Sequence, residues 1–282
     1  MPSKMHVTVV LLLAVAAAVP AAAQVKREFR YTVAPGASVA VYNEYGPVSV
    51  RAIAGRQVVV VATLASGKVE IDPLQAGNRL EFRTHVLERI SERDGSVHYD
   101  VSVPPDANVN VRVVNGPITA ENILGDLTLL DDAGTVDLRN CSGGHVRVQT
   151  ISGPVTLSES SNGYIDITSV SGNVALKNVT GRKVTVNTNR GAIRYEGDVG
   201  QNAAYSLINN TGNIDFIAPA GASMDVTARS VSGSVENDFP LQPKRHTRFV
   251  PQTGRAFTGT SNAGSSTVEL RSFSGTIRVK KR

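Results

Sequence analysis

The chain has 282 residues and a formal net charge of +5; 5% of its residues are aromatic, Trp is absent, and there is a single cysteine. One cysteine cannot form an internal disulfide, so stability must come from packing and backbone pairing. The basic residues are scattered without interleaved aromatics, which argues against a nucleic-acid partner, whereas the positive charge favours an anionic neighbour.

The first 23 residues have the pattern of a secretory signal peptide. Lys4 precedes an apolar run over 7–19, and three alanines precede Gln24. The alternative is a membrane anchor, but as a helix this run would extend about 20 Å, short of the roughly 30 Å hydrocarbon core. We therefore predict cleavage after Ala23, no later membrane-spanning segment, and export to the periplasm, the cell surface or the extracellular space.

Residues 24–105 are predicted to contain a first coil and an irregular N-terminal β cap. Strand-like runs at 57–64, 68–71, 79–86 and 96–103 are separated by charged segments and do not repeat. The end of a repeat array would otherwise present unpaired strand edges, so a cap is expected there. Two prolines at 104–105 mark the expected junction with the regular part, 106–282.

A short glycine-containing unit, often Ser-Gly-x-Val, recurs along the chain. The marker glycines are Gly46, Gly116, Gly134, Gly153, Gly172, Gly191, Gly212, Gly233 and Gly275. From Gly116 to Gly233 they lie 18 to 21 residues apart, the last interval equals two coils, and the second residue after every marker is Val or Ile. Equal spacing with a constant core residue indicates stacked coils and not a sandwich.

Four positions around each marker glycine form apolar columns: seven and five residues before it, and two and four after it, with Asn237 as an exception. This period of two predicts two strands per coil. Three residues before the glycine, from Thr150 onwards, the residue is Thr, Ser or Asn, and we expect these side chains to hydrogen-bond along the axis. The fold predicted is an all-β, single-domain β-solenoid (β-helix) with two short strands per coil of about 18–21 residues and an irregular N-terminal β cap.

The stretch 237–264 interrupts the repeat and is predicted to be a basic loop. Its candidate residues for binding an anionic surface are Lys244, Arg245, Arg248 and Arg255. Loops on rigid scaffolds often carry function, and the partner expected is an anionic envelope glycan, a lipid phosphate or an envelope protein. A solvated loop without a partner is the alternative. The chain closes on a strand followed by basic residues at 280–282, which we expect to protect the last sheet edge.

The opening coil at 41–50, the repeated Ser-Gly-x-Val units and the closing stretch at 265–279 together resemble the putative-adhesin family of bacterial envelope proteins, a domain of unknown function. The resemblance covers roughly 29–279. It implies a β-helix and an adhesive or envelope-associated role, and it implies no catalytic or ligand-binding residues.

One outward column suggests an alternative enzymatic function. Arg194, Asp215 and Glu236 each follow a marker glycine by three residues, so we expect them on consecutive coils. A carboxylate pair there would suit a glycan-active enzyme resembling the β-helical polysaccharide lyases or hydrolases. A solvated charge ladder is the favoured interpretation.

Other polar clusters have simpler explanations. The acidic cluster Asp126, Asp131, Asp132 and Asp137 could attract Ca²⁺, but its spacing fits no calcium loop, and turn or surface positions are favoured. The histidines lack a zinc-ligand spacing, and Cys141 falls in an apolar column, which predicts a buried thiol. We therefore predict no catalytic residue, metal or cofactor, and a non-catalytic exported envelope protein acting as an adhesin or interaction scaffold.

Overall fold

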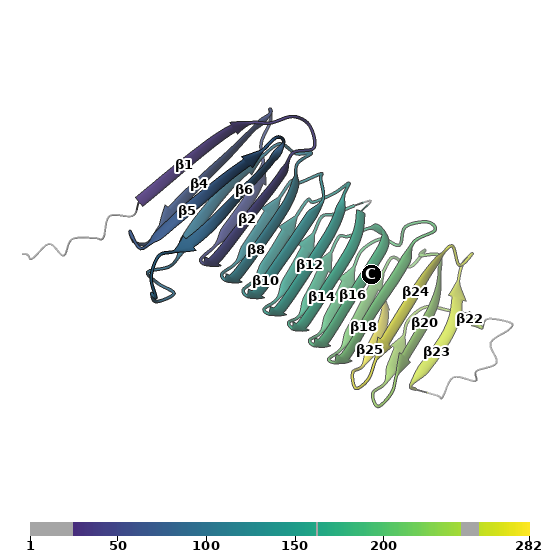
Figure 1. Ribbon diagram of the computed structural model, residues 1–282. Helices are drawn as coiled ribbons and strands as arrows, with labels where there is room; N and C mark the ends of the chain where they lie inside the picture. Colours follow the sequence, from purple (N-terminus) through teal and green to yellow (C-terminus); the bar gives the residue numbers. More distant parts are fainter. Residues whose placement is uncertain (1–24, 162, 244–253) are drawn as a thin grey trace, which may run out of the picture.

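The computed structural model describes residues 25–161, 163–243 and 254–282, and in these ranges the regular elements are all strands, arranged in two long sheets (Figure 1). No helix among the described residues is long and apolar enough to cross a membrane. The predicted signal peptide, 1–23, lies outside the described residues.

Each marker glycine joins two strands that belong to different sheets. The first coil consists of β2 (Ser38–Tyr45) and β3 (Val48–Ala52). The remaining coils, in chain order, are β8 (Asn108–Asn115) with β9 (Ile118–Glu121), β10 (Leu127–Ala133) with β11 (Val136–Arg139), β12 (His145–Ser152) with β13 (Val155–Ser158), β14 (Gly163–Ser171) with β15 (Val174–Lys177), β16 (Gly181–Arg190) with β17 (Ile193–Glu196), β18 (Ala204–Thr211) with β19 (Ile214–Ala218), β20 (Met224–Ser230) with β21 (Val235–Asn237), and β24 (Ser266–Ser272) with β25 (Ile277–Lys281).

Equivalent positions of neighbouring coils pair in parallel, so that Leu127 lies beside Val146 and Val136 beside Val155. Side chains alternate between the two faces of a strand, and the predicted apolar columns therefore point between the sheets. Leu127 and Leu138 are fully buried there, and Val155 is 1% exposed. The β-solenoid prediction is confirmed, and its core is the stack of these columns.

Close stacking of the corners explains the marker glycines. A Cβ atom on Gly153 would lie 1.7 Å from the carbonyl oxygen of Gly134, and one on Gly275 would lie 1.6 Å from that of Gly212. Gly153 also has a φ of 116°, which side-chain-bearing residues rarely adopt. Gly275 shows no positive φ, so the requirement that the two glycines share is the approach of the neighbouring backbone.

The second corner uses asparagine instead. Asn122, Asn140 and Asn178 occupy equivalent positions with φ between 51° and 61°, a left-handed conformation that Asn tolerates better than most residues, and Glu159 adopts the same conformation, with φ 54°, in the coil between Asn140 and Asn178. The Asn140 side-chain amide donates to the Asn122 side-chain oxygen at 2.7 Å, which links successive corners.

At the C-terminal end the coils do not stack in chain order. Strand β25 lies between β19 and β21, and β24 lies between β18 and β20. The last coil in the sequence is therefore an interior coil (Figure 1). The expectation that the C-terminal strand ends the sheet, with 280–282 protecting its edge, is wrong, because β21 covers β25.

Strands of the N-terminal region close the other end of both sheets. They are β1 (Val25–Thr32), β4 (Gln57–Leu64), β5 (Val69–Ala76), β6 (Arg79–Val86) and β7 (Val97–Val103). β6 and β7 stack in parallel on β2 and β3, whereas β1 pairs with β4, and β5 with β6, in antiparallel fashion. Here too a later segment of the chain lies outside an earlier coil.

Part of the stretch predicted to be a basic loop forms strands. β22 (Gln242–Pro243) and β23 (Ala256–Ser261) pair with each other, and β23 pairs antiparallel with β20. They extend the 13-stranded sheet beyond β20. The segment 244–253 between them is outside the described residues.

Candidate functional site

The carboxylate column on the outer face of the 12-stranded sheet does not form a catalytic pair. Asp215 lies beside Arg278, and Arg278 lies beside Glu236, because β25 intervenes between β19 and β21. Arg278 contacts the Asp215 carboxylate at 3.3 Å and the Glu236 carboxylate at 3.2 Å. The expectation that Asp215 and Glu236 lie on consecutive coils is therefore wrong: an arginine bridges the two acids, which leaves no carboxylate pair poised for acid/base catalysis.

The four aspartates that are close in sequence do not converge on one site. The Asp126 carboxylate accepts a hydrogen bond from the backbone N–H of His145 at 2.8 Å. Asp137 is exposed on β11, whereas Asp131 is buried on β10. No group of three or more potential metal-ligating His, Cys, Asp or Glu side chains occurs in the described ranges.

Asp131 occupies the corner column three residues before a marker glycine. It is 1% exposed and lies between Val113 and Thr150 of the adjacent coils. Neither carboxylate oxygen has a hydrogen-bond partner among the described residues. Burial raises the pKa of Asp131 to about 7, the nearby Asp132 carboxylate adds to this, and the amide of Ala133 opposes it.

Several other polar side chains of this column donate hydrogen bonds to backbone carbonyls, whereas the buried Ser169 hydroxyl has no partner among the described residues. Asn209 donates to the carbonyls of Gly191 and Gly212, Thr188 donates to that of Gly191, and Ser230 donates to that of Gly275. The expected hydrogen bonds along the axis form at Asn209 and Ser230, whose acceptors are backbone carbonyls of a neighbouring coil. These donors satisfy corner carbonyls that would otherwise be buried without a partner.

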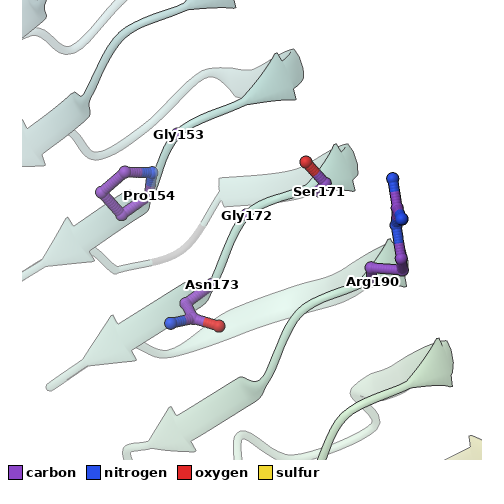
Figure 2. Close-up of a pocket in the computed structure, with 6 residues that line it drawn as sticks. All are labelled: Gly153, Pro154, Ser171, Gly172, Asn173 and Arg190. Atoms are coloured by element: carbon purple, nitrogen blue, oxygen red, sulfur yellow. The ribbon is translucent and has the colours of Figure 1, made fainter.

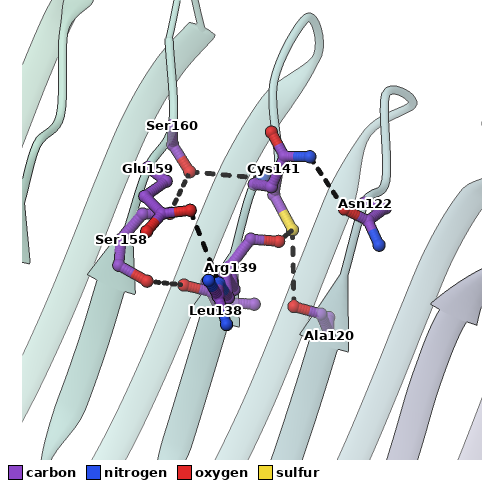
Figure 3. Close-up of polar contacts among 9 residues, drawn as sticks. Ala120, Asn122, Leu138, Arg139, Cys141, Ser158, Glu159 and Ser160 are labelled. Atoms are coloured by element: carbon purple, nitrogen blue, oxygen red, sulfur yellow. Dashed lines mark hydrogen bonds and ion pairs between the residues drawn. The ribbon is translucent and has the colours of Figure 1, made fainter.

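Cys141 is a buried thiol in the second corner, as its column predicts. Its Sγ lies 3.4 Å from the carbonyl oxygen of Arg139 and 3.6 Å from that of Ala120 (Figure 3). Burial raises the pKa of the thiol. A protonated, enclosed sulfur of this kind is a poor nucleophile.

The histidines that the structure describes make local contacts on separate strands. His85 contacts the Asp72 carboxylate at 3.3 Å, and His98 contacts that of Asp100 at 3.5 Å. His145 meets the Tyr164 ring edge-on, with 6.4 Å between the ring centroids. These contacts bring no histidine to a nucleophile.

Of the four candidate residues for anionic-surface binding, only Arg255 is described; Lys244, Arg245 and Arg248 are among residues 244–253. Arg255 is exposed immediately before β23, and its guanidinium donates to the carbonyl of Val231 at 3.4 Å. Its backbone carbonyl accepts from the Ser230 amide. Arg255 is thus anchored to the end of β20.

A shallow hollow of about 350 Å³ lies at the glycine corner of three successive coils (Figure 2). It is lined by Gly153, Pro154, Ser171, Gly172, Asn173 and Arg190. The Asn173 side-chain oxygen is occupied by the amide of Ala192, which leaves Arg190 as the charged group at its rim. Such a surface can hold a small polar or anionic group, but it contains no acid/base pair.

An exposed apolar ridge runs beside this corner, formed by residues two positions before the marker glycines. Ile151 and Val170 are neighbours with exposed fractions of 54% and 44%, and Val231 and Phe273 are neighbours with 47% and 55%. Asp132 separates Val114 from Ile151 in this column, and Asn189 and Asn210 separate Val170 from Phe273, so the ridge consists of two separate apolar pairs. The ridge residues and Asp131 each occupy one fixed column of the repeat, so an alignment of the coils on their glycines can reveal both.

The fold places the protein in the class of two-sheet β-solenoids. The surfaces that the structure describes are formed by the corners between strands and by outward-facing strand residues, many of them in ion pairs. The chain belongs to the Toastrack family DUF4097, whose family model matches residues 38–280. A comparison with curated proteins gave no match.

The solved structures similar to this chain share little sequence with it. A "putative adhesin" from Bacteroides fragilis NCTC 9343 is 11% identical, with a TM-score of 0.51, and the match covers 93% of this chain and 99% of that one. A "putative cell adhesion protein" from Clostridium sporogenes ATCC 15579 is 12% identical, with a TM-score of 0.31, and the match covers 91% and 100%. The similarity to the Bacteroides fragilis protein shows that a protein of known crystal structure shares this fold.

Proposed function

We propose that this protein is an exported, non-catalytic scaffold of the bacterial envelope or cell surface that binds an envelope partner, as an adhesin or interaction module. The observation that carries the proposal is the apolar ridge beside the glycine corner. Exposed apolar patches often mark interaction sites, and here Ile151 lies beside Val170, and Val231 beside Phe273, on adjacent coils of a rigid frame.

Export is supported by the signal-peptide pattern of residues 1–23 and by the similar fold of the Bacteroides fragilis protein named a putative adhesin. A fold that depends on stacked backbone ladders needs no disulfide, which suits a chain with a single buried cysteine in any compartment. We place the protein in the periplasm, at the cell surface or outside the cell.

The partner we propose is an anionic envelope glycan, a lipid phosphate or an envelope protein. Positive charge at Lys244, Arg245, Arg248 and Arg255 would attract phosphate or carboxylate groups. Arg255 stands at the same end of the solenoid as the ridge residues Val231 and Phe273, because its guanidinium bonds the Val231 carbonyl. An apolar contact and a basic contact are thus close enough to act together.

The test is retention of the purified protein on immobilised envelope fractions and on vesicles with anionic or neutral headgroups. Serine substitutions at Val231 and Phe273, and separately glutamate substitutions at Lys244, Arg245 and Arg248, should each reduce retention at least tenfold. A matched control reverses three exposed basic residues elsewhere, Lys177, Arg182 and Lys183. Retention that is unchanged in both test variants would overturn the proposal.

The same samples distinguish a scaffold from a glycan-active enzyme. Incubation with each glycan should release no new reducing ends or unsaturated products. Since Arg278 bridges Asp215 and Glu236, substituting either acid with its amide should not change the yield. Product that disappears in these variants would establish the enzymatic alternative.

A further inference from the structure

Strand β1 differs from the other three strands that end the two sheets. β21 has three residues and β22 has two, so neither offers a long ladder. β5 has eight residues but contains Pro73, which has no backbone N–H to donate. β1 also has eight residues and contains neither proline nor glycine, and among the described residues it pairs on one side only, with β4. Its free edge is therefore an unblocked template for another strand.

The inner face of β1 covers the end of the core incompletely. Phe29 and Tyr31 are half-buried and pack on Phe82, with ring-centroid distances of 5.6 and 6.0 Å. Val25, on the same face, is 40% exposed. Apolar surface therefore lies directly beside the unpaired backbone edge.

The charges of β1 are self-complementary in one antiparallel register. A two-fold axis perpendicular to the sheet would place a second β1 antiparallel to the first and keep each side chain on its own face. With the axis at Phe29, Glu28 lies opposite Arg30 of the second copy, twice by symmetry. Arg27 then lies opposite Tyr31, where a guanidinium can pack on the ring. Lys26 lies opposite Thr32.

Each neighbouring symmetric register sets like charges opposite one another. An axis at Arg27 places Arg27 against itself, and an axis at Arg30 places Arg30 against itself. An axis at Glu28 opposes the two Glu28 side chains and also sets Lys26 against Arg30. Directly opposed like charges destabilise a strand pair. Among the registers with the axis at Arg27, Glu28, Phe29 or Arg30, only the one centred on Phe29 sets opposite charges against each other.

We propose that a second copy of this chain docks on β1 in that register, forming a two-fold dimer in which the two 12-stranded sheets join into one continuous sheet. The backbone edges pair with each other, and the two Phe29 rings meet at the axis. In the single chain Arg30 already bonds Glu28, and in the dimer these four side chains form a ring of alternating charge. The proposal does not depend on which envelope ligand the protein binds.

The test is sedimentation equilibrium of the protein expressed with its own N-terminal segment and purified from exported material. The wild type should be a dimer, and Glu28→Arg or Arg30→Glu alone should raise the dissociation constant roughly tenfold or more, because attraction becomes repulsion twice. The double variant Glu28→Arg, Arg30→Glu should restore dimerisation. A mixture of the two single variants should form heterodimers, because the first carries a positive charge at both positions, the second carries a negative charge at both, and each position faces the other across the axis.

Glu70→Arg, an exposed charge reversal on the proline-containing strand β5, serves as the matched control and should leave the dimer unchanged. Circular dichroism checks that every variant keeps the wild-type strand content. A monomeric wild type at millimolar concentration overturns the proposal and leaves the β1 edge to a segment of some other protein. A dimer that is indifferent to all β1 variants, or one that both single variants weaken and the double variant fails to restore, overturns it as well.

Discussion

The buried carboxyl of Asp131 should make the solenoid less stable as the pH rises from about 4 to about 7. In the folded chain its pKa is about 7, whereas the ordinary value of an aspartate is 3.8. The folded state therefore holds the proton more tightly than the unfolded state, and in this interval every step toward higher pH favours unfolding. At about 1.4 kcal/mol per pKa unit, the difference corresponds to about 4 kcal/mol above pH 7.

The corner column explains why the neutral form fits. Asn209 and Ser230 donate hydrogen bonds to corner carbonyls, and a carboxylate has no proton to donate, whereas a carboxylic acid has one. Asp131→Asn supplies a permanent amide donor of nearly the same shape. We expect this variant to be more stable than the wild type at pH 8, by up to about 4 kcal/mol, and little different at pH 4.

Thermal unfolding monitored by circular dichroism at pH 4, 6 and 8 measures this effect as a difference between variant and wild type. A gain of that size corresponds to a rise in Tm on the order of 10 °C at pH 8 for a chain of this length. Asp132→Asn makes the same change in charge at a partly exposed neighbouring site and should shift Tm little. If Asp131→Asn and the wild type lose stability in parallel across this pH range, the inference that Asp131 is protonated in the fold is refuted.

Three further predictions concern the corners and the outer column. Gly153→Ala should lower the free energy of unfolding by more than about 3 kcal/mol, because its Cβ would overlap the Gly134 carbonyl. Gly67→Ala, which has open space around it, should change the free energy of unfolding little. Chemical denaturation compares the two variants, and equal losses of stability would contradict the stacking of the corners. Arg278→Leu should lower the free energy of unfolding by about 1 kcal/mol at low salt, because it leaves two carboxylates unpaired, and high salt should reduce this loss. A loss of stability that does not change with salt would mean that the packing of the arginine matters more than its charge. Cys141 should react with a thiol reagent only after denaturant is added, because burial raises its pKa and the corner encloses it, and rapid labelling of the native protein would show that this corner opens.

The sequence predicts the coil but not the order of the coils. Val and Ile two residues after each glycine fix the strands and their inward face, because a one-residue slip would expose the whole column. The same regularity makes interior coils interchangeable: Ile214 could stack equally well on Val235 or on Ile277, and the structure places it on Ile277. Register within a coil is a local property, whereas the choice of neighbour depends on long connections that carry no repeat.

One residue did carry information about that choice. Asn237 breaks the apolar column four residues after its glycine, whereas Val279 keeps it, and Val279 is fully buried while Asn237 is exposed. A polar residue in a core column is tolerated only where a neighbouring coil is missing on one side. The broken column therefore marks the coil of β20 and β21 as the terminal one, which the order of the sequence conceals.

The pairing of candidate charges could not be predicted for the same reason. Asp215 and Glu236 follow successive glycines, so their separation along the chain suggests adjacency, and only the insertion of β25 places Arg278 between them. The position of Asp131 in the corner column can be predicted from the alignment, since it shares that column with Thr150. The protonation of its carboxyl cannot be predicted in this way, because it depends on how completely the adjacent coils exclude water.

The inserted coils also change how the ends of the solenoid resist unfolding. A linear stack loses its terminal repeats first, since each end repeat has a neighbour on one side only. Here β24 and β25, which include the last strand residues of the chain, pair on both sides, so they cannot separate until β20 and β21 have left. At the other end β2 and β3 lie between β6 and β7 on one side and β8 and β9 on the other. Both ends of the regular chain are thus held inside the stack. The 12-stranded sheet ends instead in β1, which precedes the first coil, and in β21 of the coil before the last. A partner can therefore dock on β1 while β2 and β3 stay paired on both sides.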